Sequence, residues 1–264
     1  MSIKDKIYES IETANELWLL LDYDGTLADF APTPDHVIPD PELIGLIRKL
    51  AHHPKIRIAV ISGRRLSHIE KLVPVEGIWL FGSYGLEMRL PSGERIQRAA
   101  YPSIRPDLDR LKPAWAELIE GQEGFYLEDK GWSLALHARF ASDDNAAMTL
   151  EKAKALAQSI VSEGVFSLLG GDKFLEVAPH SANKGKTVRY LLDEFASPST
   201  LPIYIGDDDK DEAAFPVVQS LGGIAGCVGC SHRASSADFF LSSPKETRRW
   251  LANLPAWPGT SPPN

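Results

Sequence analysis

The sequence predicts an α/β fold in which a doubly wound, mostly parallel sheet carries an inserted α+β unit. Short apolar runs alternate with helical patterns along most of the chain, which is typical of parallel strands joined by helices. In the middle of the chain, hairpin patterns replace this alternation. With 264 residues, 44% of them hydrophobic, the chain can bury the core of one large domain or of a domain with an insertion.

Six strands are expected in the parallel sheet, at residues 17–21, 56–61, 77–81, 202–205, 222–228 and 238–241. Between the first two, residues 40–53 carry apolar side chains at helical spacing. Two further helical patterns lie at 210–221 and 243–254, and Pro244 suits the first turn of the last helix. This order of elements favours a doubly wound sheet.

The inserted unit is placed at 103–175, which leaves 1–102 and 176–264 as the main domain. A hairpin pattern at 86–98 precedes it. The unit and its end contain a helix at 106–121, a hairpin at 125–140, a helix at 143–163 and a hairpin at 165–178. This order predicts a small α+β layer of its own.

The charge balance argues against two classes of partner. There are 28 Lys and Arg residues against 36 Asp and Glu, a net charge of −8, so long-range attraction to nucleic acid or anionic membranes is not expected. The N-terminus has no apolar signal region, and no run approaches the ~20 apolar residues of a membrane helix. We therefore expect a cytoplasmic protein, with a monomer as the default oligomeric state.

The two cysteines, Cys227 and Cys230, form a lone CxxC with His232 just beyond. A zinc site would need a second pair, and a thioredoxin-type motif would open a helix. Small buried or semi-buried thiols are the expectation here.

Polar residues follow the strands at the edge where an α/β sheet binds its ligands. They are Asp22 and Asp24 after the first strand, Ser62 and Gly63 after the second, the acidic run 207–211 after the fourth, and Lys184 at the start of the helix before it. Two carboxylates 4 Å apart repel by about 4 kcal/mol at an effective dielectric of 20. A hard cation such as Mg²⁺, together with a phosphoryl group, would balance this cluster.

Four of these segments, "DYDGT", "SGR", "NKG" and "GDDDKDE", resemble the motifs of the haloacid dehalogenase (HAD) superfamily of aspartyl-nucleophile phosphatases. Three more, "GSYGLE", "LEDKGWSLALHAR" and "FLEVAPHSANKGK", are similar to segments of trehalose-6-phosphate phosphatases. The resemblance spans about residues 17–216. It implies a HAD, Rossmann-like catalytic core, an inserted cap that sets specificity, Mg²⁺ as cofactor and a sugar phosphate as substrate.

The resemblance also implies roles for the core residues. Asp22 would be the nucleophile, and Asp24 the general acid and then base. Lys184 would balance the charge of the phosphate. The phosphate-binding residues would be Thr26, Ser62 and Gly63, and the metal-binding residues Asp22, Asp24 (through its carbonyl), Asp207 and Asp208, with Asp211 in support. Arg64 would contact the substrate or form a salt bridge, and these two roles stay open.

In the cap, Glu128, Lys130, Ser133 and Glu176 fall where the family contacts the sugar. The alternative to this binding role is that the four residues are solvated and only flank hairpin turns. His137 is expected to be structural.

Two positions depart from the family pattern: Tyr84 stands where histidine is usual, and Lys210 where threonine is usual. Neither touches the covalent step, but both bear on substrate preference or on the geometry of the metal loop.

The leading hypothesis is hydrolysis of trehalose 6-phosphate. The nearest alternatives keep the chemistry and change the substrate to mannosyl- or glucosyl-3-phosphoglycerate, sucrose 6-phosphate or another sugar phosphate. A signalling receiver is a different class, but it would be about half this length and would have no cap. A catalytically inactive regulatory subunit is disfavoured because every motif residue is present.

Overall fold

The structure, a computed structural model, describes residues 3–30, 37–171, 173–230 and 233–254. The chain forms two compact units, one of Met1–Ile96 with Asn183–Asn264 and one of Gln97–Ala182. We call them the core unit and the cap unit. The cap unit extends a few residues beyond the predicted insertion at each end, because helix α4 begins at Tyr101 and strand β9 continues to Pro179.

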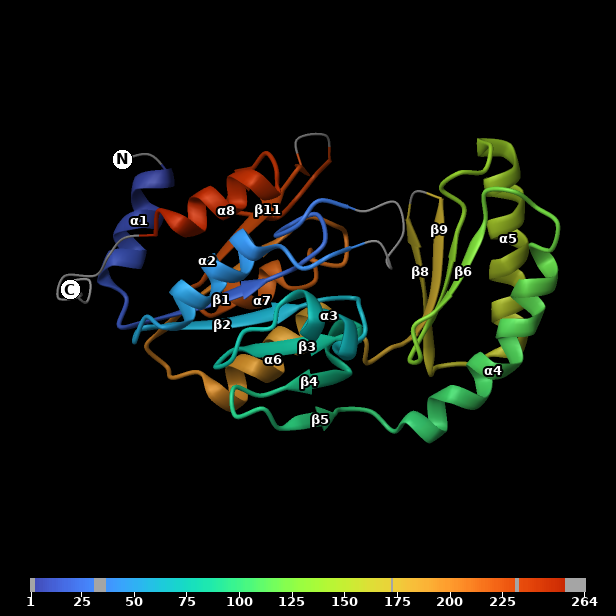
Figure 1. Ribbon diagram of the computed structural model, residues 1–264, viewed down its shortest axis with the longest axis horizontal. Coiled ribbons are helices and arrows are strands. Elements are labelled where there is room, and N and C mark those ends of the chain that lie inside the picture. The colour runs from blue at the N-terminus through green and yellow to red at the C-terminus, as the bar shows by residue number, and fades with distance from the viewer. Residues whose placement is uncertain (1–2, 31–36, 172, 231–232, 255–264) are drawn as a thin grey trace. The chain divides into compact units, whose positions relative to one another are not determined.

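The core unit is built on an eight-stranded sheet in the order β12-β11-β10-β1-β2-β3-β4-β5 (Figure 1). Its strands are β1 (Glu16–Leu21), β2 (Ile56–Ile61), β3 (Trp79–Gly82), β4 (Glu87–Arg89), β5 (Arg95–Gln97), β10 (Thr200–Gly206), β11 (Ile224–Val228) and β12 (Phe239–Leu241). The strands from β12 to β3 pair in parallel, and β4 pairs antiparallel with β3. The six predicted strands and the doubly wound, mostly parallel sheet are thereby confirmed.

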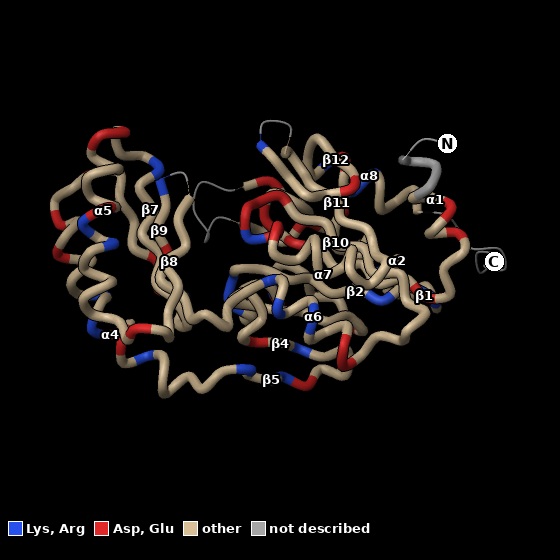
Figure 2. Tube along the Cα trace, turned by 180° about the vertical axis from the view of Figure 1, so that it is seen from behind, with Lys and Arg blue, Asp and Glu red and all other residues tan. Residues whose placement is uncertain are grey.

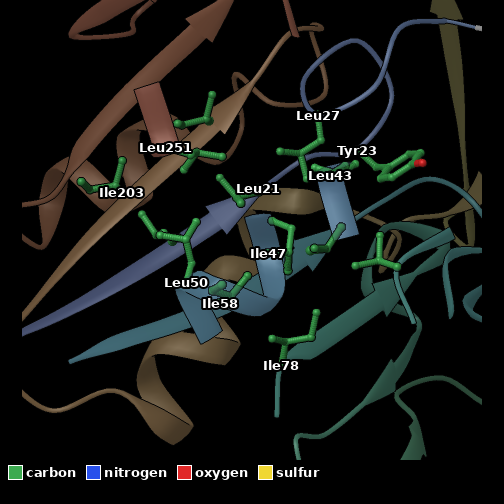
Figure 3. Close-up of a cluster of buried hydrophobic side chains, with 14 of the residues drawn as sticks. Leu21, Tyr23, Leu27, Leu43, Ile47, Leu50, Ile58, Ile78, Ile203 and Leu251 are labelled. Atoms are coloured by element: carbon green, nitrogen blue, oxygen red, sulfur yellow. The ribbon is translucent and has the colours of Figure 1, made fainter. Parts of the chain in front are cut away.

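Helices cover both faces of this sheet. They are α1 (Ile3–Thr13), α2 (Pro41–Ala51), α3 (Leu66–Leu72), α6 (Lys184–Phe195), α7 (Phe215–Ser220) and α8 (Pro244–Ala252). Side chains of α1, α2, α3 and α8 share one hydrophobic cluster, in which Leu21, Leu43 and Ile47 lie together (Figure 3). Side chains of α6 and α7 join Trp18 and Leu20 in the cluster on the opposite face. Alternate residues of β1 therefore face the two layers, and the strand is buried on both sides.

Local signals fix the ends of several helices. Asp40 caps α2 by accepting hydrogen bonds from the backbone N–H groups of Glu42 and Leu43. Asn183 caps α6 and Ser243 caps α8 in the same way. The sequence reasoning missed α1 and α3, and the helix predicted at 210–221 is shorter, because residues 210–214 form turns.

The cap unit is a four-stranded antiparallel sheet in the order β6-β7-β9-β8, with two helices. Its elements are α4 (Tyr101–Leu118), β6 (Tyr126–Asp129), β7 (Leu134–His137), α5 (Asp143–Ile160), β8 (Phe166–Gly171) and β9 (Phe174–Pro179). Trp115 of α4 is buried, and its indole N–H donates to the carbonyl of Ala153 in α5 at 2.9 Å. This bond joins the two helices.

The prediction of free thiols is wrong. Cys227 and Cys230 are both buried, as expected, but they are joined in a disulfide. Their Cα atoms are 5.9 Å apart, within the range that a disulfide spans. His232 lies outside the described residues. Within the described part of the chain, no helix combines the length and the apolar character of a membrane span.

Candidate active site

The order of the strands in the core sheet determines where the candidate site lies. The chain runs from β1 outward through β2 and β3, and later from β10 outward through β11 and β12, so its direction of winding reverses between β1 and β10. Sheets of this type bind ligands at such a reversal, beyond the carboxyl ends of the strands. Asp22 directly follows β1, and Asp207 directly follows β10. Figure 2 shows acidic residues gathered beside β10.

Asp22 is held next to Lys184. Its backbone N–H donates to the carbonyl of Ile205 at 3.0 Å, which fixes the residue at the strand end. The Lys184 ammonium lies 2.8 Å from Asp22 Oδ1 and 2.7 Å from Asp211 Oδ1. Burial raises the pKa of Asp22 well above its usual range; Lys184 opposes that rise, and Asp211 adds to it.

Lys184 is a buried cation, only 2% exposed, at the first position of α6. Burial alone would lower its pKa, but Asp211 and Asp22 outweigh burial and raise the pKa well above its usual value. A lysine at a helix N-terminus is unfavourable unless anions lie nearby. Lys184 therefore stays charged between two carboxylates.

Asp211 is a buried acceptor whose hydrogen-bonding capacity is used within the protein. Its Oδ1 accepts from Lys184 and from the Tyr204 hydroxyl, the latter at 2.5 Å. Its Oδ2 accepts from the backbone N–H groups of Asp207 and Asp208, both at 3.0 Å. Asp211 thus shapes the loop that carries the other two acids.

Asp207 faces the turn that follows Asp22. Thr26 Oγ1 donates to Asp207 Oδ1 at 3.1 Å. Gly25 has a φ of 75°, and a Cβ atom there would lie 2.1 Å from Asp207 Oδ2. Only glycine therefore fits between the two segments. Burial raises the pKa of Asp207 to about 7, and Asp211 adds to that rise.

These carboxylates suit a hard cation. Asp22, Asp207 and Asp211 each bring an oxygen atom within 4.8 Å of the others. Because Asp211 already accepts four hydrogen bonds, Asp22 and Asp207 are the two that keep oxygen atoms for a metal. Burial is the main cause of the raised pKa values of Asp22 and Asp207, and the neighbouring carboxylates add to it; a divalent ion would offset both effects. The donor set fits Mg²⁺, which commonly takes one or two protein carboxylates.

Asp208 is placed differently from Asp207. Its Oδ1 accepts from the backbone N–H groups of Lys210 and Asp211, at 2.9 and 3.2 Å. Burial works against its ionisation, but Lys184 and Lys210 outweigh burial, so its pKa lies below the usual range. Asp208 is not among the three converging carboxylates, and its contacts are with the loop.

The second strand ends in a buried turn. Ser62 is fully buried, its N–H donates to the carbonyl of Phe81 at 2.9 Å, and its hydroxyl accepts from the Arg64 N–H at 3.1 Å. A Cβ on Gly63 would lie 2.7 Å from ring atoms of Tyr84, so glycine is needed here for space. This turn is the predicted phosphate-binding segment.

The sequence left two roles open for Arg64, a contact with the substrate and a salt bridge. In the structure Arg64 forms a salt bridge. Its guanidinium forms a bidentate pair with Asp24, with Nε 2.7 Å from Oδ2 and Nη2 2.6 Å from Oδ1. The Arg64 side chain is only 10% exposed. Two parallel charge-assisted bonds fix the orientation of the Asp24 carboxylate.

The four predicted cap residues form one polar cluster. Glu128 in β6 and Glu176 in β9 each pair with Ala135 of the strand between them, so both lie on one face of the sheet. Lys130 Nζ lies 3.2 Å from Glu176 Oε1 and 4.0 Å from Glu128 Oε2. Ser133 Oγ donates to Glu176 Oε1 at 2.6 Å.

Glu128 has a second partner. The His137 Nε2 atom lies 3.0 Å from Glu128 Oε2. Burial works against ionisation of Glu128, but His137 and Lys130 outweigh burial and hold its pKa below the usual range. Glu176 is fully buried, and the Glu128 and Lys130 side chains are only 19% and 11% exposed, so these residues are not freely solvated.

Sequence reasoning missed two residues of the site. Tyr204 supports Asp211, and its only signal was a hydroxyl in a strand expected to be buried, where it would need a partner. Arg233 donates to the carbonyl of Asp207 at 3.0 Å and pairs with Asp209 and Glu212. It lies in a segment with no motif, so no signal pointed to it.

Comparisons with known proteins show first the fold and then the family. The fold is shared with a haloacid dehalogenase-like hydrolase from Bacteroides thetaiotaomicron, at a TM-score of 0.61 and 15% identity over 89% of this chain and 98% of that one. It is also shared with the C-terminal domain of trehalose-6-phosphate phosphatase from C. albicans, at a TM-score of 0.83 and 24% identity over 95% of this chain and 97% of that one.

The trehalose-phosphatase family model matches residues 20–245. The chain belongs to this family. It is 31% identical to a probable trehalose-phosphate phosphatase of Sinorhizobium fredii, over 96% of this chain and 93% of that protein. It is 30% identical to the trehalose-phosphate phosphatase of Mycobacterium leprae, over 92% of this chain but only 58% of that longer protein.

Proposed function

We propose that this protein is a Mg²⁺-dependent phosphatase that hydrolyses trehalose 6-phosphate to trehalose and phosphate. The observation that carries the proposal is the arrangement at the winding reversal, where Asp22 and Asp207 lie beside the buried Lys184 ammonium. The choice of sugar is supported by the family membership and by the similarity to trehalose-phosphate phosphatases.

The reaction would proceed in two steps. An Asp22 oxygen attacks phosphorus and the bond from phosphorus to the sugar oxygen breaks. Asp24, which takes up a proton when Arg64 releases one of its oxygens, gives that proton to the sugar oxygen. Water then attacks the aspartyl-phosphate and gives its proton to Asp24, the bond between phosphorus and Asp22 breaks, and phosphate leaves. Asp24 is therefore protonated again at the end of the second step.

The phosphoryl group would be held by positive charge and by short-range donors. Lys184 balances its charge together with that of Asp22. Thr26, Ser62 and the N–H of Gly63 supply hydrogen bonds to its oxygen atoms. Thr26 and Ser62 are both fully buried, so they are shielded from competing water.

A Mg²⁺ ion would be held by Asp22 and Asp207, with the Asp24 carbonyl and Asp208 as the further expected contacts. Such an ion neutralises the negative charge that otherwise opposes attack of a carboxylate on a phosphate. In the cap, the cluster of Glu128, Lys130, Ser133 and Glu176 would contact sugar hydroxyls.

The test is phosphate release from a panel of sugar phosphates after treatment with a chelator, with and without added Mg²⁺. Trehalose 6-phosphate should give the highest kcat/KM, and Mg²⁺ should restore activity where Ca²⁺ restores little, because Ca²⁺ prefers longer bonds and more ligands. A preference for sucrose 6-phosphate or a glycosyl-3-phosphoglycerate would replace the substrate and keep the chemistry. Full activity after exhaustive chelation would contradict the metal assignment.

A further inference from the structure

Two residues near the site have no role in the proposed mechanism, and they contact each other. Tyr84 lies in the turn Ser83–Gly85 that follows β3, and Lys210 lies in the loop that follows β10. The Lys210 ammonium lies 5.4 Å from the centroid of the Tyr84 ring. This distance is within the range of a cation–π interaction. They are also the two positions at which the sequence departs from the family pattern.

Tyr84 is attached to the phosphate-binding turn. Its backbone N–H donates to the carbonyl of Ser62 at 2.9 Å, and the N–H of Ser83 donates to the carbonyl of Arg64 at 2.7 Å. The Tyr84 ring occupies the space where Gly63 would carry a side chain, since a Cβ there would lie 2.7 Å from two ring carbons. The ring therefore packs directly against the turn.

The backbone of Tyr84 indicates that its position is enforced. It has φ 56° and ψ 26°, in the left-handed region that a bulky residue rarely adopts. The side chain is only 5% exposed. Residues held in this region persist where the surrounding structure fixes them. The carbonyl of Tyr84 is also fixed, because it accepts a hydrogen bond from Thr187 Oγ1 at 2.8 Å.

Lys210 is attached to the acidic loop. Its backbone N–H donates to Asp208 Oδ1 at 2.9 Å, and its ammonium lies 3.7 Å from Asp208 Oδ2. The same ammonium faces the Tyr84 ring. Lys210 therefore connects the segment that carries Asp207 and Asp208 with the ring that rests on Gly63.

We infer that Tyr84 and Lys210 form a pair of positioning residues that fixes the phosphate-binding turn, Ser62–Arg64, relative to the acidic loop, Asp207–Asp211. This inference rests on the proposed function, because it assigns the pair to the phosphoryl-binding side of the same site. The pair acts on the part common to all phosphate esters, so its loss should affect a sugar phosphate and an aryl phosphate equally.

Kinetic double-mutant analysis tests the coupling. Tyr84→Leu and Lys210→Met should each lower kcat/KM on p-nitrophenyl phosphate about three- to tenfold, and weaken inhibition by inorganic phosphate to a similar extent. The double variant should be no worse than the poorer single variant, because both changes remove the same interaction. Tyr84→Phe keeps the ring and Lys210→Arg keeps the charge, so both should retain nearly full activity. Lys49→Met, an exposed change on α2, is the matched control.

Hydrogen exchange separates this inference from the proposed function, because it needs no turnover. Tyr84→Leu should speed amide exchange in residues 207–211, and Lys210→Met should speed it in residues 62–64. The inference is overturned if each substitution loosens only its own segment, or if the kinetic losses of the two single variants multiply in the double variant. A protein that hydrolyses no phosphate ester would contradict the proposed function, and the exchange result would still decide the role of the pair.

Discussion

At the scale of single residues, the site is a set of carboxylates that differ in their surroundings. Asp22 and Asp207 are buried with raised pKa values, whereas Asp208 has a lowered one. Asp24 is oriented by an arginine, and Asp211 is saturated with hydrogen bonds. Because groups of one chemical type lie in different environments, they can take different roles.

Asp22→Asn should abolish turnover and leave the fold intact. The variant loses the proposed nucleophile, but Lys184 keeps its contact with Asp211, so no buried charge is left alone. Removing one member of a repelling group should leave the melting temperature unchanged or raise it. Phosphate release and thermal unfolding are the two measurements. Turnover near that of the wild type would show that another residue attacks the phosphate.

Arg64→Lys should lower kcat/KM by about ten- to a hundredfold, because a lysine cannot reproduce the bidentate pair that orients Asp24. The loss should grow as the leaving group becomes more basic, since an alkoxide depends more on a proton from Asp24 than a nitrophenolate does.

Arg65→Lys, at the exposed neighbouring position, is the control for this variant. A loss that is uniform across a series of aryl phosphates would instead give Arg64 a direct contact with the substrate. The sequence could place Asp24 and Arg64 at two strand ends, but their pairing across 40 residues depends on tertiary structure.

At the scale of elements, the sequence predicted strands better than helices. The parallel strands are continuous apolar runs, which is typical of strands that are buried on both faces. The helical spacing of apolar residues predicted a helix that starts at Pro106. The helix begins earlier, at Tyr101, whose ring packs edge-on against Trp132 at 4.9 Å. A contact between segments that are distant in the sequence produces no periodic pattern, so the earlier start of the helix could not be predicted from it.

The pair formed by Arg105 and Asp129 connects α4 to β6. The Arg105 guanidinium forms two hydrogen bonds of 2.7 Å with the two Asp129 oxygens, and it also contacts Asp109. The hydrogen bond from Arg105 is the main cause that lowers the pKa of Asp129 well below its usual range, and burial opposes it. A lowered pKa contributes stability above the unfolded pKa of about 3.9, and that stability is lost as the pH falls through the folded value.

Asp129→Asn should therefore lower the free energy of unfolding by about 1–2 kcal/mol at pH 7, an estimate reduced because the pair is partly exposed. The difference from the wild type should shrink below about pH 4. Denaturant unfolding across this pH range measures it. Asp109→Asn is the matched control, because it removes an exposed partner of the same arginine and should cost little. If the two variants lowered the free energy of unfolding equally, this would contradict a specific stabilising link between Arg105 and Asp129 of β6.

At the scale of the whole molecule, the chain has two units with different proposed tasks. The core unit carries the carboxylate cluster, and the cap unit carries the cluster around Glu176. The sequence predicted the first group from the ends of the strands and the second from the resemblance to a family. It did not predict Arg233 or the disulfide, because these depend on how loops close at the end of the sheet.

Glu128→Ala tests the division of tasks. If Glu128 accepts hydrogen bonds from sugar hydroxyls, its loss should lower kcat/KM on trehalose 6-phosphate by about ten- to a hundredfold. The activity on p-nitrophenyl phosphate, which has no sugar, should change little. Glu117→Ala, an exposed change on α4, is the matched control. An equal loss on both substrates would give Glu128 a role in folding. No loss on either substrate would show that Glu128 is a solvated residue beside a hairpin turn.

The parallel pairing of β1 with β10 sets the order in which this protein can become active during its synthesis. Thr26 and Asp207, which hydrogen bond to each other, are 181 residues apart in the chain. A growing chain completes β2, β3 and all of the cap unit before β10 leaves the ribosome. Until then β1 has one unpaired edge, which invites pairing with other nascent chains. The strand that completes the active site is therefore also the one that ends this exposure, so catalytic competence and protection from aggregation arise in the same folding step.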